Sequence, residues 1–150
     1  TEVINQRRER VALLRTAPVL SPTGGMLGKL RLPFSLGLGW RLGSGQQWMP
    51  WIALQDEVAL IDFLLHHTEC SGVFNACAPG LVRHAQFTQA LATALHRPAI
   101  LPAPAWALQL ALGEMSVLLL GGQRLQPRRA LEAGFVFRYP ELGAALAQLV

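Results

Sequence analysis

Charged residues are scarce in this sequence. Only 15% of its 150 residues are Asp, Glu, Lys or Arg, whereas 51% are hydrophobic. A composition this apolar excludes an intrinsically disordered chain, and the length is sufficient for one domain with its own core. In soluble domains about a quarter of all residues are usually charged. The lower fraction of charged residues here indicates that part of the apolar surface is covered by something outside this chain.

Cysteine is also scarce, and long uninterrupted hydrophobic runs are lacking. Cys70 and Cys77 are too few for a disulfide framework and have neither zinc nor thioredoxin spacing. The most apolar region, Ile100–Gly122, contains two prolines, a glutamine and a glutamate, which argues against a membrane-spanning helix. The polar stretch TEVINQRRERVALL has no signal-peptide core. We therefore predict a cytoplasmic protein with reduced cysteines and no membrane partner.

Lysine is nearly absent, and the basic residues form no stripe. The net charge is +4, with thirteen basic and nine acidic residues. Twelve of the thirteen are arginines, and they are scattered along the sequence apart from Arg7, Arg8, Arg10 and the pair Arg128–Arg129. Nucleic-acid binding requires a basic stripe with aromatic residues among it, so we predict no nucleic-acid partner.

The hydrophobic pattern alternates between strand-like and helix-like segments, which predicts an α/β fold. Expected strands are Val11–Leu14, Gln47–Leu54 with a break near Pro50, Val73–Ala76, Ile100–Leu101 and Phe135–Arg138. Expected helices are Met26–Leu36 with an interruption at Pro33, a helix that begins at Asp56, Ala85–Leu95, Trp106–Leu112, Glu114–Leu120, Arg128–Ala133 and Leu142–Leu149. The apolar run Val11–Leu14 suits a buried strand of a parallel sheet. The glycine-rich stretch Gly37–Gly45 is expected to be a loop.

The helix after the second strand carries two specific expectations. Asp56 is a good N-cap residue, and Glu57 in the first turn suits the helix dipole. Val58, Ile61, Leu64 and Leu65 are spaced so that they share one apolar face, which we expect to be buried.

Four blocks of sequence carry a family resemblance. They are VALLRTAPVLSPTGGML (Val11–Leu27), GSGQQWMPWIALQDEVALIDFLL (Gly43–Leu65), GVFNACAP (Gly72–Pro79) and the region Gly113–Leu142 with GEMSVLLLGGQRLQPRRALEAGFVFRYPEL. In this order they resemble the C-terminal half of the bacterial NAD(P)-dependent epimerase/dehydratase-like proteins. These are atypical extended short-chain dehydrogenases, some of them labelled as relatives of cell-division inhibitors. The last block is the most specific.

The resemblance implies a fold and an organisation. The fold is the end of a Rossmann-type parallel sheet plus a small α/β substrate domain with a helical C-terminal cap. Residues 1–97 would form the Rossmann-like unit with its substrate-side loop, and residues 98–150 would form the cap. The resemblance also implies NADP or NAD as cofactor of the intact protein.

Two features that such enzymes use are missing. The spacing Gly-x-x-Gly-x-x-Gly, whose glycines let a helix N-terminus approach a pyrophosphate, occurs nowhere. A Tyr-x-x-x-Lys pair is impossible, because Tyr139 is the only tyrosine and Lys29 the only lysine. We therefore expect no cofactor for this chain alone, assign no catalytic residue, and leave open whether the intact protein is an enzyme.

Five residues are candidates for substrate or cofactor binding. Arg15 follows a buried strand, where it could pair with a phosphate or be locally paired. Gln46, Gln47 and Trp48 occupy the loop that grips the nucleotide in extended members of the family; the Trp48 ring either stacks on a base or fills the core. Asn75 either holds a ribose or bonds nearby backbone. No metal site is expected, because the adjacent His66 and His67 face different directions on a helix.

These features leave two functions to be compared. The first is the substrate-binding C-terminal half of an NAD(P)-dependent nucleotide-sugar epimerase or oxidoreductase-like protein that lacks the glycine-rich cofactor loop. The second is a non-enzymatic interaction module linked to cell division. We expect a nucleotide-sugar-like small molecule as ligand. We also expect either a missing N-terminal half or a second copy of the chain as partner, because an uncovered sheet edge tends to associate.

Overall fold

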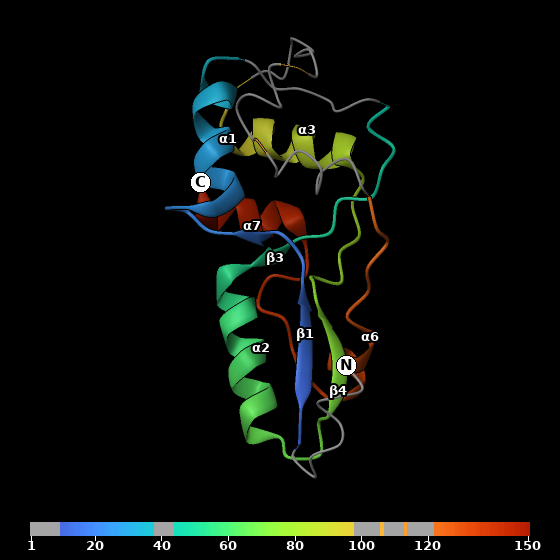
Figure 1. Ribbon diagram of the computed structural model, residues 1–150. Coiled ribbons are helices and arrows are strands. Elements are labelled where there is room, and N and C mark those ends of the chain that lie inside the picture. The colour runs from blue at the N-terminus through green and yellow to red at the C-terminus, as the bar shows by residue number, and fades with distance from the viewer. Residues whose placement is uncertain (1–9, 38–43, 98–105, 107–112, 114–121) are drawn as a thin grey trace.

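The computed structural model describes residues 10–37, 44–97, 106, 113 and 122–150, and shows an α/β arrangement (Figure 1). Its strands are β1 (Ala12–Thr16), β2 (Val19–Leu20), β3 (Ile52–Ala53) and β4 (Gly72–Ala76). Its helices are α1 (Gly25–Ser35), α2 (Leu54–His66), α3 (His84–Ala94), α6 (Arg128–Glu132) and α7 (Leu142–Leu149). The predicted segments Ile100–Leu101 and Glu114–Leu120, the segment Trp106–Leu112 apart from Trp106 itself, and most of the Gly37–Gly45 loop lie outside the described residues, as does the start of the predicted cap at residue 98.

The strands pair in parallel, as the sequence predicts. β1 pairs with β4 in the register Ala12 to Gly72 through Thr16 to Ala76, and β2 pairs with β3. The predicted strand Gln47–Leu54 is broken near Pro50, as expected: Ile52–Ala53 is strand after the break, and before it Trp48 forms only an isolated antiparallel bridge with Arg83. Proline at position 50 explains the break, because it has no N–H to donate.

Two hydrophobic clusters hold the described part together. The sheet cluster lies between β1, β4, α2 and the segment 130–137; its buried members are Ile52, Leu60, Leu64, Cys70, Phe74, Ala76, Ala130, Phe135 and Phe137. The helix cluster lies where α1, α3 and α7 meet; its larger buried members are Met26, Leu27, Phe34, Met49, Trp51, Phe87, Leu91, Leu142 and Leu146. The region after residue 122 therefore contributes to both clusters.

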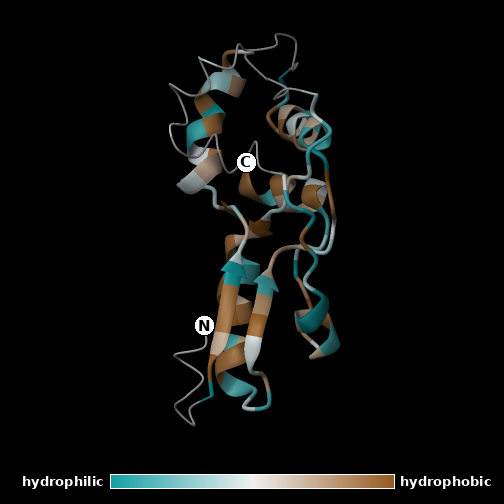
Figure 2. Cartoon of the chain, turned by 45° about the vertical axis from the view of Figure 1, so that its right-hand side comes forward, coloured by the Kyte–Doolittle hydropathy of each residue, from teal (hydrophilic) through white to brown (hydrophobic). Residues whose placement is uncertain are grey.

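The buried face of α2 differs from the prediction. Leu64 is buried, but Val58, Ile61 and Leu65 are exposed, and the helix instead buries Asp56, Glu57, Leu60 and Leu64. Helix α2 is apolar on two faces, and periodicity alone does not say which of them meets the sheet. Figure 2 shows the two main strands lying in front of this helix.

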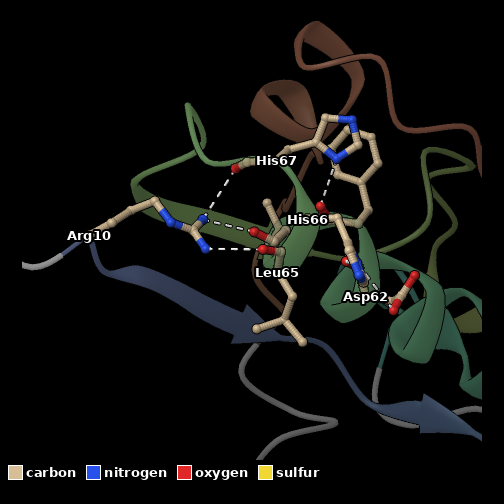
Figure 3. A network of polar contacts seen from close by, with 7 residues as sticks. Arg10, Asp62, Leu65, His66 and His67 are labelled. Atoms are coloured by element: carbon tan, nitrogen blue, oxygen red, sulfur yellow. Dashed lines mark hydrogen bonds and ion pairs between the residues drawn. The ribbon is translucent and has the colours of Figure 1, made fainter.

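Arg10 fixes the C-terminal end of α2. Its guanidinium donates hydrogen bonds to the carbonyl oxygens of Leu64 (2.8 Å), Leu65 (3.3 Å), His67 (3.2 Å) and Cys70 (3.0 Å) (Figure 3). The last carbonyls of a helix lack intrahelical partners, so a cation that donates to them stabilises the helix end.

Asp56 is not the helix cap that we predicted. Helix α2 begins at Leu54, and the residue at its N-cap position is Ala53, which makes no side-chain capping bond. The Asp56 carboxylate is buried and instead accepts hydrogen bonds from the backbone N–H groups of Arg138 (2.7 Å) and Tyr139 (2.9 Å). The predicted strand Phe135–Arg138 is absent. The Arg138 N–H bonds the Asp56 side chain and the Phe135 N–H bonds the Ala130 carbonyl, so neither pairs with a neighbouring strand.

Helix α1 also differs from its prediction. It continues through Pro33, which lies in the last turn, so the expected interruption does not occur. A proline there removes a single helical hydrogen bond close to the end of the helix, where the consequence is small.

Among the described residues, no helix is long and apolar enough to cross a membrane.

Candidate functional site

The carboxyl ends of β1 and β4 bring two of the predicted site residues side by side. Arg15 and Asn75 are register partners in the parallel pair. Arg15 is exposed and Asn75 is half-buried. The Asn75 side-chain amide donates a 3.2 Å hydrogen bond to the backbone carbonyl of Gln126, which draws the segment after residue 122 to this end of the sheet. Ligands of open α/β sheets bind at the carboxyl ends of the strands.

The same segment passes very close to the predicted loop residues. A β-carbon on Gly122 would lie 2.8 Å from the Gln47 β-carbon and 3.0 Å from the Trp48 backbone nitrogen. Gly122 also has a positive φ of 22°, which side-chain-bearing residues rarely adopt. Glycine at this position therefore permits the two segments to pack against each other.

The Trp48 ring contacts two arginines and is not part of the core. Its ring is half-buried and belongs to neither hydrophobic cluster. The Arg83 guanidinium carbon is 3.6 Å from the ring centroid, and that of Arg124 is 5.4 Å away. Both distances are within the range of a cation–π contact. Arg83 also donates a hydrogen bond to the carbonyl of Gln46, so it holds the loop and the ring together.

A polar cleft of about 500 Å³ opens beside this cluster, lined by Asn75, Arg124, Gln126 and Arg128. Among the described residues, its lining includes two guanidinium groups and no carboxylate. Within the described part of the chain, neither arginine belongs to an ion pair. A guanidinium offers paired N–H donors that match phosphate oxygens, so the cleft is suited chemically to an anionic ligand.

A buried acid lies near the end of β1. The Thr16 hydroxyl donates a 2.9 Å hydrogen bond to Glu57 Oε1, whereas Glu57 Oε2 is buried without a partner. Burial raises the pKa of Glu57 above its usual value of 4.5, and the hydrogen bond from Thr16 opposes this shift. The raised pKa follows from the cost of placing a charge in a poorly solvated site.

The other perturbed groups lie away from the cleft lining. Burial lowers the pKa of His84 to about 4 and raises the pKa of the Cys77 thiol to about 11. His84 is therefore neutral and Cys77 is a thiol at neutral pH. No group of three His, Cys, Asp or Glu side chains within the described ranges is placed to hold a metal ion.

The structure gathers the candidate residues into one region. Asn75 lines the cleft, Arg15 is aligned with it, and Gln46, Gln47 and Trp48 are joined to the cleft through Arg124 and Gly122. No role was predicted from the sequence for Arg83, Arg124, Gln126 or Arg128. Three of these lie in the motif GQRLQPRR, whose density of arginine was the available signal.

Residues 103–149 match a protein family described as a domain of unknown function, DUF1731. The Mycobacterium bovis epimerase family protein Mb2239 is 45% identical over 147 residues, which cover 97% of this chain and 49% of the relative. The bovine epimerase family protein SDR39U1 is 42% identical over 143 residues, which cover 94% of this chain and 49% of the relative. The chain thus spans about half the length of the relatives that it matches.

Solved structures extend the comparison. A crystal structure of human epimerase family protein SDR39U1 with NADPH matches with a TM-score of 0.86 and 39% identity, covering 93% of this chain and 48% of that chain. These similarities support the epimerase family for this chain. Like this epimerase family protein, the chain has a Rossmann-type α/β fold, which confirms the predicted fold class.

Proposed function

We propose that this chain is the C-terminal, ligand-binding half of a nucleotide-sugar epimerase-like protein, and that the cleft of Asn75, Arg124, Gln126 and Arg128 receives the diphosphate of its ligand. The observation that carries the proposal is the pair of arginines in a cleft whose described lining residues include no carboxylate. The position at the carboxyl ends of β1 and β4 supports it, because this is where open α/β sheets bind ligands.

Each candidate residue has a role in this proposal. Arg124 and Arg128 bind the phosphate oxygens, each through paired N–H donors. Asn75 orients the Gln126 backbone, and Arg15 adds positive charge at the adjacent strand end. Trp48 and Arg83 act as positioning residues, because they hold Arg124 at the rim of the cleft. Gln46 and Gln47 contribute the backbone against which this group packs.

In this proposal the described residues do not form a dinucleotide site. The glycine fingerprint is missing from the sequence, and the Gly25 turn before α1 is filled by its own chain, since a β-carbon there would meet the Val19 carbonyl at 3.2 Å. We therefore derive no reaction step through NADP or NAD. In this proposal the cofactor, and any acid or base catalyst, comes from the half of the fold that this chain does not match.

The alternative of a cell-division module lacks a comparable observation. None of the relatives named above carries a cell-division label in its name. The cleft, in contrast, points to a small anionic ligand, so we retain the nucleotide-sugar proposal.

Calorimetric titration tests the proposal. UDP-glucose and UDP should bind the chain, and Arg124→Met and Arg128→Met should each weaken binding at least about tenfold, which corresponds to ~1.4 kcal/mol. Arg97→Met is the matched control, because Arg97 is exposed and does not line the cleft. NADPH and NADH serve as comparison ligands. Micromolar binding of either dinucleotide, or UDP-glucose binding that survives both substitutions, would contradict the proposal.

A further inference from the structure

A second cavity, of about 280 Å³, adjoins the polar cleft. We call it the α6 pocket, and its lining residues are Pro79, Gln126, Pro127, Arg128, Leu131 and Glu132. Gln126 and Arg128 also line the cleft, so the two cavities share this segment of the chain as a wall. Complete sites for small ligands usually have a volume of ~300–1,000 Å³. The α6 pocket therefore suits one part of a ligand whose remainder lies in the cleft.

Helix α6, which forms one wall of the pocket, is fixed against β4 (Figure 1). The Arg129 guanidinium donates hydrogen bonds to the carbonyls of Ser71 (2.6 Å) and Val73 (2.8 Å), which closes the outer edge of the strand pair. A β-carbon on Gly72 would lie only 2.9 Å from Arg129 Nη1, so glycine leaves room for this guanidinium. Ala130 is buried in the sheet cluster. Contacts of the fold itself thus position the helix, which lowers the entropy cost of binding a ligand beside it.

Three of the lining residues offer carbon surface. Pro79 follows the carboxyl end of β4 and is half-buried, and Pro127 is buried at the start of α6. Leu131, one helical turn after Pro127, is 47% exposed although its side chain is apolar. Such surfaces gain from contact with the C–H groups of a ligand. A nucleobase stacks best on an aromatic ring, and the described residues place no aromatic side chain in the lining of this pocket.

Glu132 brings a negative charge to the pocket. It follows Arg128 by four residues on α6, yet within the described part of the chain the two side chains form no ion pair. An ionised carboxylate only accepts hydrogen bonds, so it favours a hydroxyl group, whereas it repels a second carboxylate. The cleft thus presents two guanidinium groups, and the α6 pocket adds a carboxylate beside carbon surface.

We propose that the α6 pocket is a subsite for a neutral, hydroxyl-bearing pyranose that is joined to a diphosphate in the cleft, and that Glu132 selects this sugar over a uronic acid. The inference rests on the proposed function, which places the diphosphate on Arg124 and Arg128. The two prolines and Leu131 pack against the C–H face of the ring, and Glu132 accepts hydrogen bonds from its hydroxyl groups. Because Arg128 binds phosphate, its guanidinium does not neutralise a carboxylate on the sugar.

Calorimetric titration of the chain with three ligands tests the subsite. UDP presents the diphosphate without a pyranose, UDP-glucose adds a neutral pyranose, and UDP-glucuronate adds a charged one. The wild type should bind UDP-glucose at least about tenfold more tightly than UDP-glucuronate, because Glu132 repels the second carboxylate. Glu132→Gln should reduce this ratio at least about fivefold, since the amide carries no charge.

A second variant tests the carbon surface. Leu131→Ala should weaken the binding of UDP-glucose about threefold and leave that of UDP unchanged, because it removes apolar contact with the pyranose alone. Both substituted side chains are exposed, so neither replacement disturbs the core. Glu69→Gln is the matched control for Glu132→Gln, because Glu69 is also exposed and lines neither cavity, and it should change no affinity.

The outcomes separate this subsite from the cleft. Equal affinities of the wild type for UDP-glucose and UDP-glucuronate, or an unchanged ratio in Glu132→Gln, would overturn the inference. Equal weakening of UDP and UDP-glucose by Leu131→Ala would also overturn it, because the nucleoside would then occupy the pocket. In each of these cases UDP still binds through Arg124 and Arg128. Failure of the proposed function appears differently, as UDP that does not bind or that still binds after Arg124→Met and Arg128→Met.

Discussion

The carboxylate of Asp56 accepts a 2.9 Å hydrogen bond from the backbone N–H of Tyr139, a residue 83 positions later in the chain. A second bond, from the N–H of Arg138, makes the same carboxylate a bridge between the start of α2 and the segment before α7. This bridge connects the two hydrophobic clusters, because Phe135 and Phe137 belong to the sheet cluster and Leu142 belongs to the helix cluster.

Replacing Asp56 by alanine should destabilise the fold strongly. The substitution leaves two backbone N–H groups without their acceptor, which we expect to lower the free energy of unfolding by about 2–4 kcal/mol. Urea denaturation measures this change. Asp62→Ala is the control, because Asp62 lies on the exposed side of the same helix and pairs with the exposed His66. Equal effects of the two substitutions would contradict the role assigned to Asp56.

Glu57→Gln should stabilise the protein at neutral and alkaline pH. Burial raises the pKa of Glu57, so the fold bears the cost of an ionised, poorly solvated carboxylate once the pH exceeds that raised pKa. The contribution of the protonated Glu57 to the stability of the wild type is fully present below pH 4.5 and is lost as the pH rises through the raised pKa. Glutamine keeps an acceptor for the Thr16 hydroxyl. Thermal unfolding should show a higher Tm for the variant at pH 8, by about 2–4 °C for each kcal/mol, and a difference that shrinks toward pH 4.

His84 should make the fold sensitive to acid. Its pKa is lowered to about 4 by burial, so its neutral form stabilises the native state above pH 6.5 and this stabilisation is lost as the pH falls from 6.5 toward 4. The size of the shift corresponds to about 3 kcal/mol at pH 4. His84→Gln should remove this part of the pH dependence in urea titrations at pH 7 and pH 4. An unshifted NMR titration of the His84 ring would be inconsistent with this account.

Gly122→Ala should separate the segment after residue 122 from the loop that carries Trp48. The new β-carbon would collide with Gln47 and with the Trp48 backbone, and the positive φ adds strain. We expect a loss of about 1–3 kcal/mol in stability and weaker binding of UDP-glucose. Gly143→Ala is the matched control: no atom lies within 4 Å of a β-carbon there, and alanine favours the α7 helix. If the two variants have the same stability and bind UDP-glucose equally well, the close approach at Gly122 contributes to neither property.

The cysteines should be unreactive while the protein is folded. Cys70 and Cys77 are both free and buried, and the Cys77 pKa of about 11 leaves only about one thousandth of this thiol ionised at pH 8. A thiol reagent such as Ellman's reagent should therefore react slowly with native protein at pH 8 and rapidly with both cysteines in guanidinium chloride. Fast labelling of Cys77 in the native state would show that the site is open to solvent.

Local sequence patterns predicted much of the fold. The apolar run that became β1, the strand β4 and the helices α3 and α7 were placed within two residues of their observed bounds. Periodicity succeeds at these places because the identity of a strand or helix depends on residues that are near one another in the chain. The glycine and proline signals around Trp48 predicted the irregular path of that loop but not its partner.

The sequence by itself determined the types and order of these elements and the lack of a dinucleotide fingerprint. Only the tertiary structure decided that Asp56 bonds Arg138 and Tyr139, that Arg124 reaches Trp48 and the cleft, and that Arg129 closes one edge of the strand pair. It also decided which apolar face of α2 is buried. The physical reason is the same throughout: a side chain that bonds a distant backbone, or a helix with two apolar faces, has alternatives of similar local energy, and packing between remote segments selects one of them.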